Sequence, residues 1–192
     1  LAGSSTVVSP GSGAVCAYDP DNGMEIWRVT YGMGFSVVPR PVFTQGMVFV
    51  SSGFNTPVAY AIRVGGAGDV TDSHVIWKTS RGAPETPSML PLGQRVLCVS
   101  DQGIVTCWDA RTGKERWRGR LGDDVSASPV FADGRVYIVS ESGLTFVVAA
   151  EGGFSVLAKN DLGERSLATP AISGRALYFR TETQLYRIED GD

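Results

Sequence analysis

Four residues of the kind that bind hard cations lie within seven positions near the start of the chain: Asp19, Asp21, Asn22 and Glu25. Carboxylate and amide oxygens are the ligands that Ca²⁺ prefers. An EF-hand loop needs ligands at alternate positions, a central glycine and a distal glutamate, and this stretch lacks that spacing. Pro20 within Asp-Pro-Asp-Asn-Gly is typical of a tight turn. We therefore predict a turn here and no metal site.

The three cysteines are Cys16, Cys98 and Cys107, and His74 is the single histidine. Zinc sites combine several Cys and His ligands, so this inventory does not favour one. Cys98 and Cys107 fall on the two arms of one predicted hairpin. A two-residue turn at Gln102-Gly103 would place them opposite each other, within reach of a disulfide, whereas a one-residue change of turn removes that pairing. We favour two buried thiols, which pack as small apolar side chains.

Basic residues alternate between positions 114 and 120: Lys114, Arg116, Arg118 and Arg120. On a strand all four would point to one face, with Trp117 on the other. Such a row would suit an anionic partner. We favour the simpler interpretation that it keeps an outermost strand soluble and discourages edge pairing.

Composition excludes several functional classes. The net charge of -3 gives no reason to expect nucleic acid as a partner. No apolar run approaches the ~20 residues of a membrane span, so we expect no direct membrane insertion. Serines are frequent, but no histidine is placed to activate one as a nucleophile. Because the chain starts at Leu1 without a methionine, we interpret it as a processed or excised piece.

These residues lie within a repeat of about 40 positions, a period typical of stacked supersecondary units. A proline opens a short strand at Pro41, Pro87, Pro129 and Pro170. An alternating apolar run follows a turn each time, and a tryptophan ends the unit at Trp27, Trp77 and Trp117, with Leu157 as a degenerate copy. β-branched and aromatic residues fill the runs, while Gly, Asp, Asn and Ser fill the gaps. Each unit therefore predicts four antiparallel strands, which we term a to d.

We predict one domain over 1–192, divided into a partial blade 1–35, blades 36–80, 81–122 and 123–163, and a partial blade 164–192. The first lacks strand a and the last lacks strand d. No 3.6-residue apolar stripe is present, so we expect almost no helix. The connection Val64–Ser73 between strands c and d of the second unit is long and glycine-rich, and we expect it to be mobile.

A four-stranded sheet with apolar residues on both faces must pack against neighbours, and radial packing as propeller blades achieves this. The spacing Ala-x-Asp-x-x-x-Gly-x-x-x-Trp occurs at Ala17, Asp19, Gly23 and Trp27, and again at Asp109, Gly113 and Trp117 with Cys107 in the alanine place. This pattern resembles the tryptophan-docking motif of pyrroloquinoline-quinone (PQQ)-type β-propeller repeats. The WD-repeat propeller is the competing interpretation, but no Gly-His pair precedes any unit.

The resemblance implies an all-β fold of four-stranded blades. Such rings have about seven or eight blades, and this chain supplies about four. We expect a C-terminal portion of a larger propeller, because Leu185–Glu189 looks like a final strand. We also predict that two copies of the chain meet at the exposed ends of the segment, forming a homodimer.

PQQ-like propellers include quinoprotein dehydrogenases, an outer-membrane assembly lipoprotein and extracytoplasmic sensor domains of bacterial Ser/Thr kinases. The dehydrogenases need a calcium-bound quinone and often have a vicinal disulfide, and this chain has no adjacent Cys pair. We therefore predict a non-catalytic scaffold without a cofactor, periplasmic or otherwise extracytoplasmic. A dehydrogenase fragment and a kinase sensor domain are the alternatives.

The d-to-a connections are the predicted binding surface, because in a propeller they line one end of the central channel. We expect a protein or a small ligand to contact Tyr31, Met33 and Phe35 on the first connection, Arg81 and Glu85 on the second, Asp124 on the third and Arg165 on the fourth. The first connection is unusually apolar for a loop, which suits a contact patch.

Overall fold

The computed structural model describes residues 5–32 and 34–189, and these form five sheets. The first contains β1 (Val7–Pro10), β2 (Ala14–Tyr18), β3 (Glu25–Thr30) and β7 (Gly68–Asp69); the second β4 (Val42–Thr44), β5 (Met47–Ser51), β6 (Ala59–Arg63) and β8 (Val75–Thr79); the third β9 (Leu90–Leu92), β10 (Arg95–Val99), β11 (Ile104–Asp109) and β12 (Glu115–Arg120); the fourth β13 (Val130–Ala132), β14 (Arg135–Val139), β15 (Leu144–Ala149) and β16 (Val156–Asp161); and the fifth β17 (Ala171–Ser173), β18 (Ala176–Arg180) and β19 (Leu185–Glu189).

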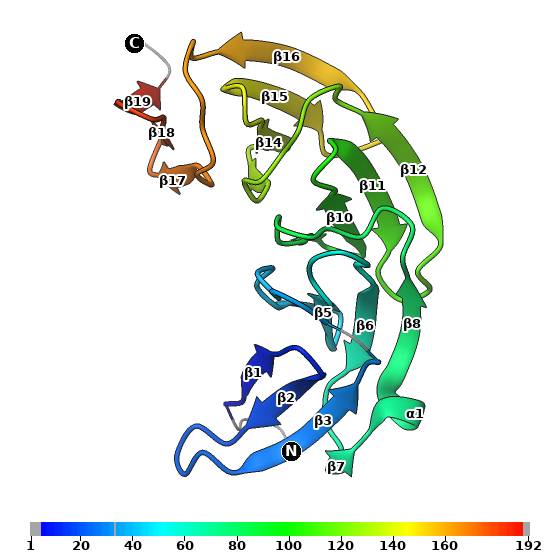
Figure 1. The fold of residues 1–192 in the computed structure, drawn as a ribbon. Helices are drawn as coiled ribbons and strands as arrows, with labels where there is room; N and C mark the ends of the chain where they lie inside the picture. The colour runs from blue at the N-terminus through cyan, green and yellow to red at the C-terminus, as the bar shows by residue number, and fades with distance from the viewer. Residues whose placement is uncertain (1–4, 33, 190–192) are drawn as a thin grey trace.

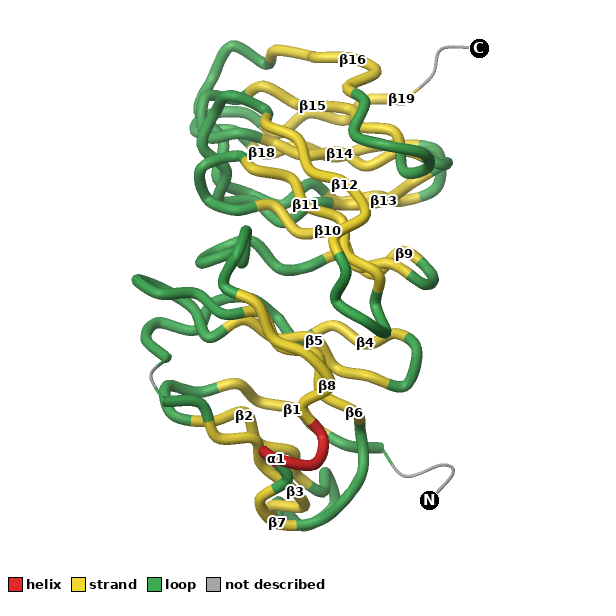
Figure 2. The backbone as a smooth tube through the Cα atoms, turned by 90° about the vertical axis from the view of Figure 1, so that its right-hand side faces the viewer, coloured by secondary structure: helices red, strands yellow, loops and turns green. Residues whose placement is uncertain are grey.

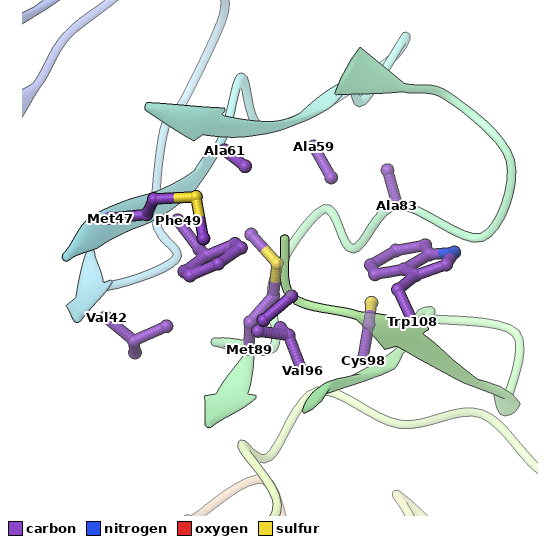
Figure 3. Packing of buried hydrophobic residues seen from close by; sticks show 11 residues of the cluster. Val42, Met47, Phe49, Ala59, Ala61, Ala83, Met89, Val96, Cys98 and Trp108 are labelled. Carbon is purple, nitrogen blue, oxygen red and sulfur yellow. The ribbon is translucent and has the colours of Figure 1, made fainter. Parts of the chain in front are cut away.

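The sheets follow one another along an arc, with strands β3, β8, β12 and β16 on its convex side (Figure 1). One apolar cluster fills each space between neighbouring sheets. Between the second and third sheets, Phe49 and Met89 approach one another from opposite sides (Figure 3). Burying each large apolar side chain contributes about 1.5–3 kcal/mol. The hydrophobic core therefore lies between blades, so each blade buries its apolar faces only against its neighbours.

The prediction of an all-β propeller built from short antiparallel blades is confirmed. Within the described residues the single helix is α1 (Thr71–His74), and it has four residues. Every pairing among the named strands is antiparallel except the parallel pair β3–β7. None of the described helical residues forms a segment long and apolar enough to cross a membrane.

The connection between β10 and β11 is not the two-residue turn at Gln102-Gly103 that a disulfide between Cys98 and Cys107 would require. The connection runs from Ser100 to Gly103 and closes with a hydrogen bond from the Gly103 amide to the Ser100 carbonyl at 2.9 Å. The longer turn shifts the pairing, so that Cys98 lies opposite Thr106 and Leu97 lies opposite Cys107. Both thiols are buried and free, as the favoured interpretation had it, and burial raises the pKa of each.

The glycine-rich connection of the second unit, which we expected to be mobile and which we call the strap (residues 64–74), forms backbone contacts with the preceding blade. Strand β7 pairs in parallel with the outer edge of β3 in the preceding blade. The Val70 amide donates to the Arg28 carbonyl at 2.9 Å, and the Thr30 amide donates to Thr71 Oγ1 at 2.8 Å. Val70 is only 3% exposed. The strap thus covers an edge that would otherwise be open to pairing.

The basic row of the third unit does not form the free cationic face that alternation predicts. Strand β12 is an outer edge strand, as expected, but its pairing with β11 is irregular next to Cys107. Arg116 forms an ion pair with Asp109 at 2.6 Å, and Arg118 lies 2.9 Å from Glu115. Two of the four basic side chains thus pair with carboxylates of their own sheet, which favours the simpler interpretation of a soluble edge strand.

Candidate functional site

The strand connections gather at two ends of the blades (Figure 2). We call the end with the b-to-c and d-to-a connections the loop end, and the end with the a-to-b and c-to-d connections the turn end. The tryptophan motif lies at the turn end, and the predicted binding residues lie at the loop end. The two sets of residues therefore do different work.

At the turn end the Asp-x-x-x-Gly residues build tight turns. Asp19 Oδ1 accepts the Asp21 amide at 2.8 Å, and Gly23 has a φ of 72°. The Asn22 side chain accepts the Met24 amide, so these oxygens are occupied within the turn. No group of His, Cys, Asp and Glu able to hold a metal ion is found in residues 5–32 and 34–189. The turn prediction is confirmed for this stretch.

Trp77 joins the second blade to the third. Its indole Nε1 donates to the Ala110 carbonyl at 2.8 Å, and its ring lies over Gly113. The ring also meets Phe49 and Trp108, with centroids 5.8 Å away in each case. We call Trp77, Ala110 and Gly113 the Trp77 lock.

Trp27 and Trp117 make different contacts. Trp27 is 2% exposed and lies opposite Gly68 of the strap, so the strap has replaced a short turn at that junction. Trp117 packs beside Phe154 with ring centroids 6.1 Å apart, and its Nε1 is buried without a hydrogen-bond partner among the described residues. The same position of the repeat is thus a tryptophan in three units, but the contacts of its side chain differ between them.

At the loop end, a hollow of about 530 Å³ opens between the first and second blades. Its lining residues are Ser12, Gly32, Gly34, Phe35, Phe54, Asn55 and Thr56, and we call it the aromatic hollow. Phe35 is 65% exposed and Phe54 is 53% exposed, with ring centroids 6.4 Å apart. Large apolar side chains held together in water mark a binding surface.

The backbone beneath the aromatic hollow is tightly fixed. The Phe54 amide donates to the Phe35 carbonyl at 2.8 Å. Gly53 has a φ of 84°, and a methyl group added there would come within 2.6 Å of that same carbonyl oxygen. The Gly34 amide donates to the Ser12 carbonyl at 2.6 Å. A methyl group added at Gly34 would lie 2.9 Å from the same Ser12 oxygen. The backbone that presents the two rings therefore requires glycine at both Gly34 and Gly53.

Tyr31, predicted as a contact residue, is a support instead. It is 3% exposed, its hydroxyl donates to the Gly11 carbonyl at 2.6 Å, and its ring stacks on Tyr60 at 5.5 Å. Burial raises the pKa of Tyr31 to about 12, so it stays neutral and keeps this bond. Met33 lies outside the described residues.

A second hollow of about 230 Å³ lies between the second and third blades. It is lined by Pro57, Ser80, Gly82, Ala83, Glu85, Ser100, Asp101, Gln102 and Ile104, and we call it the acidic hollow. Asp101 Oδ2 accepts the Glu85 amide at 2.8 Å and the Thr86 amide at 3.3 Å, which fixes the carboxylate in place. Arg81 does not enter this hollow; it is 73% exposed and its Nε is 3.9 Å from Glu115.

Further along the loop end, the charged side chains are used within the protein. Arg165 contacts Glu141 at 3.2 Å. Hydrogen bonds from Thr181 and Thr183 hold the pKa of Glu164 below its usual value. The Asp124 carbonyl accepts the Glu141 amide at 2.8 Å, while its side chain stays at the surface. Arg165 and Asp124 therefore lie apart from Phe35 and do not share its hollow.

Two contributors were missed from the sequence: Phe54 and Asp101. Both sit on b-to-c connections, whereas the prediction considered only d-to-a connections. The connection after Ser51 spans 52–58 and is longer than its counterparts at 100–103 and 140–143. That extra length, with an aromatic residue at its tip, was the available signal.

Binding is the chemistry that these hollows support. They present aromatic faces, backbone carbonyls, hydroxyls and carboxylates. His74, the one histidine of the sequence, lies on α1 at the turn end, so it cannot serve as a base beside Ser12 or Ser100. Neither hollow therefore contains an activated serine nucleophile of the Ser-His type.

A family model matches most of this chain, and individual relatives match up to half of it. A family model described as outer membrane protein assembly factor BamB matches residues 11–67 and 63–192. The outer membrane protein assembly factor BamB of Escherichia coli (strain K12) is 28% identical over 100 residues, which cover 50% of this chain and 25% of that protein. The protein of the same name from Burkholderia pseudomallei (strain K96243) is 33% identical over 90 residues, 46% of this chain and 21% of that one.

Solved structures share the fold. The crystal structure of BamB from Moraxella catarrhalis superposes with a TM-score of 0.70 at 18% identity, covering 96% of this chain and 54% of that one. The computationally designed Ika8 protein gives a TM-score of 0.72 at 14% identity, covering 98% of this chain and 57% of the other. The chain thus spans about half the length of these structures, and the aligned region is about a quarter of the E. coli relative.

Proposed function

The chain belongs to the PQQ-like propeller family whose model is described as outer membrane protein assembly factor BamB, and we propose that it is a non-catalytic scaffold that binds another protein through its loop end. One observation carries the proposal: Phe35 and Phe54 stand exposed side by side on a fixed backbone. Exposed aromatic side chains are costly in water and are enriched where proteins bind one another. The relatives named as assembly factors support a binding role and not a catalytic one.

The proposed location is outside the cytoplasm, in the periplasm, because the matching relatives are named outer membrane protein assembly factors. Cell fractionation tests this directly. Recovery of the protein in the cytoplasmic fraction would contradict the location.

Photo-crosslinking tests the binding role. A photoreactive phenylalanine analogue replaces Phe54, and in a matched control it replaces Met24, which is 68% exposed at the turn end. Irradiation of intact cells should give a discrete protein adduct from position 54 and none from position 24. Equal adducts from both positions, or none from position 54, would contradict the proposal.

The dehydrogenase alternative makes a different demand. Addition of PQQ and Ca²⁺ to the purified protein should leave the quinone absorbance unchanged and reduce no dye. A bound quinone band would replace our proposal with the quinoprotein interpretation.

We also propose that two copies of this 192-residue chain pair through the ends of the arc. The fifth sheet supports this, because Leu185 is 73% exposed and Ile188 is 44% exposed on its edge strand. An uncovered edge with apolar side chains favours pairing. Light scattering at micromolar concentration should give the dimer mass, and a monomer would contradict the pairing.

A further inference from the structure

The aromatic and acidic hollows lie on the two sides of one chain segment. Thr56 lines the aromatic hollow, and the next residue, Pro57, lines the acidic hollow. The hollows are therefore adjacent across one chain segment, and because packed layers of polypeptide lie roughly 10 Å apart we take a separation of that order. An extended peptide advances about 3.3 Å per residue, so about three residues bridge that distance.

The two hollows differ in the chemistry that they offer. The aromatic hollow presents two rings that are more than half exposed and already held in position. An apolar side chain that packs against the exposed surfaces of both rings buries area without first ordering the site. The acidic hollow presents Asp101, fixed by two backbone amides, and Glu85, whose carboxylate makes no hydrogen bond or ion pair with any described residue.

The nearby cations do not satisfy these carboxylates. Arg81 is directed to Glu115, and Arg118 is also paired with Glu115. Two carboxylates close together without a cation attract a positive charge from a partner.

The corresponding loops of the later blades lack this arrangement. Hydrogen bonds from Ser142 and Thr181 occupy Asp123 and Glu164, and Arg165 pairs with Glu141. Their b-to-c turns are short and have no aromatic tip. The combination of exposed rings and carboxylates without a paired cation thus belongs to the first three blades of the described chain.

We propose that the two hollows form one recognition site for an extended segment of a partner protein, with an apolar side chain packed against the exposed surfaces of Phe35 and Phe54 and a basic side chain, about three residues away, bound at Glu85 and Asp101. This inference rests on the proposed protein-binding function and defines the chemistry of the partner. The rings supply affinity through buried area, and the carboxylates supply selectivity through charge.

Three capped hexapeptides test the site: Gly-Phe-Gly-Gly-Arg-Gly, the same peptide with Glu in place of Arg, and the same peptide with Ser in place of Phe. Their binding to the protein is measured by NMR titration, which detects the weak affinities, on the order of 1 mM, expected of such short ligands. The Phe/Arg peptide should bind at least about fivefold more tightly than either of the other two peptides. The protein signals whose chemical shifts it changes should belong to residues of both hollows.

Protein variants separate the two contributions. Phe54→Ser should weaken the Phe/Arg peptide at least about fivefold, and Glu85→Lys should reverse the preference between the Arg and Glu peptides. Met24→Ser, an exposed apolar residue at the turn end, is the matched control and should change nothing. The spectra of each variant confirm that it remains folded.

Equal binding of the three peptides, or no binding, would overturn the site. Cellohexaose serves as a competing occupant, and saccharide binding that Phe54→Ser abolishes would also overturn it. If position 54 still crosslinks to a protein in cells while the peptides fail, the binding function stands and only this inference falls. If both fail, the binding function falls as well.

Discussion

Two junctions between blades differ although both are built from the same repeat. Between the second and third blades the packing ring comes from the earlier blade, and between the third and fourth it comes from the later blade. In the Trp77 lock, a ring from the earlier blade lies on a glycine of the later blade, Gly113. At the next junction, Phe154 from the later blade lies on Gly119 of the earlier one. We call Phe154, Gly119 and Trp117 the Phe154 lock.

The polar groups differ accordingly. Trp77 Nε1 donates to the Ala110 carbonyl, whereas Trp117 Nε1 is buried without a described partner. The carbonyl of Ala150, which corresponds to Ala110, accepts Arg95 Nη1 at 2.6 Å instead. The two junctions thus show that the ring that fills the space between blades can come from the earlier or the later blade. The donor to the carbonyl of Ala110 or Ala150 likewise differs between the junctions.

Alanine at the glycines should separate ring packing from backbone strain, and this is the largest effect. Gly113→Ala combines a φ of 69° with a methyl group 2.7 Å from the Trp77 ring, and we expect a loss of about 2–5 kcal/mol. Gly119→Ala overlaps Phe154 without a positive φ, so we expect about 1–3 kcal/mol. Urea unfolding measures both.

Gly23→Ala is the control for strain alone, because its φ is 72° and no atom lies within 4 Å of the added methyl group. We expect it to lose only about 1–2 kcal/mol. If Gly23→Ala and Gly113→Ala are equally destabilised, packing of the Trp77 ring on Gly113 does not stabilise the contact between the second and third blades.

Replacing each tryptophan by phenylalanine should break the symmetry between the locks. Trp77→Phe removes a hydrogen bond and leaves the Ala110 carbonyl without its donor. We therefore expect it to lower the free energy of unfolding by about 1–3 kcal/mol more than Trp117→Phe does. Trp117→Phe removes a donor that has no described partner. Thermal or urea unfolding gives the difference, and equal losses would mean that the hydrogen bond contributes nothing.

The locks should also differ in their response to acid. The Arg116 guanidinium, with the Thr112 hydroxyl and amide, lowers the pKa of Asp109 to about 2. A carboxyl group whose pKa is lowered by folding stabilises the folded state at pH values above its pKa in the unfolded chain, which is near 4. This stabilisation is lost as the pH falls toward 2.

Asp109→Asn should therefore remove about 1–2 kcal/mol at neutral pH and flatten the pH dependence of unfolding between about 4 and 2. The Phe154 lock has Ala149 at the corresponding strand end, so Ala149→Ser should leave that pH dependence as it is. An unchanged acid limb in Asp109→Asn would show that its ion pair does not support the Trp77 lock.

The smallest effect concerns the donor to Ala150. Arg95→Met keeps most of the side-chain volume but removes the bond to the Ala150 carbonyl and the contact with exposed Glu151. We expect a loss of about 0.5–1.5 kcal/mol, mostly from the stranded carbonyl. Glu151→Gln, which removes only the surface charge, should change the unfolding free energy by less than about 0.5 kcal/mol.

Much of the fold was predictable because its signals are local. Alternating apolar runs, opening prolines and Asp-x-x-x-Gly turns act over a few residues, and the sheets pair consecutive strands except for β3 with β7 and β6 with β8. Phe35 and Glu85 could be selected for the same reason, since a d-to-a connection is recognisable from the strands that flank it.

The exact length of a turn was less accessible. The sequence left open whether Cys98 and Cys107 lie opposite each other, because that pairing needs a two-residue turn at Gln102-Gly103. The connection between β10 and β11 is longer, and this places Cys98 opposite Thr106. Pairing has a period of two, so a change in turn length alters every partner along the strand.

The sequence by itself determined the strands, the turns and the all-β propeller class, because these follow from periodicity and turn chemistry within each unit. Only the tertiary structure decided what crosses between units: the strap on β3, Phe154 on Gly119, and Phe54 beside Phe35. Those contacts depend on how neighbouring blades pack, and side chains from either blade can fill the same volume. For that reason the aromatic hollow appears only when the first two blades are placed side by side.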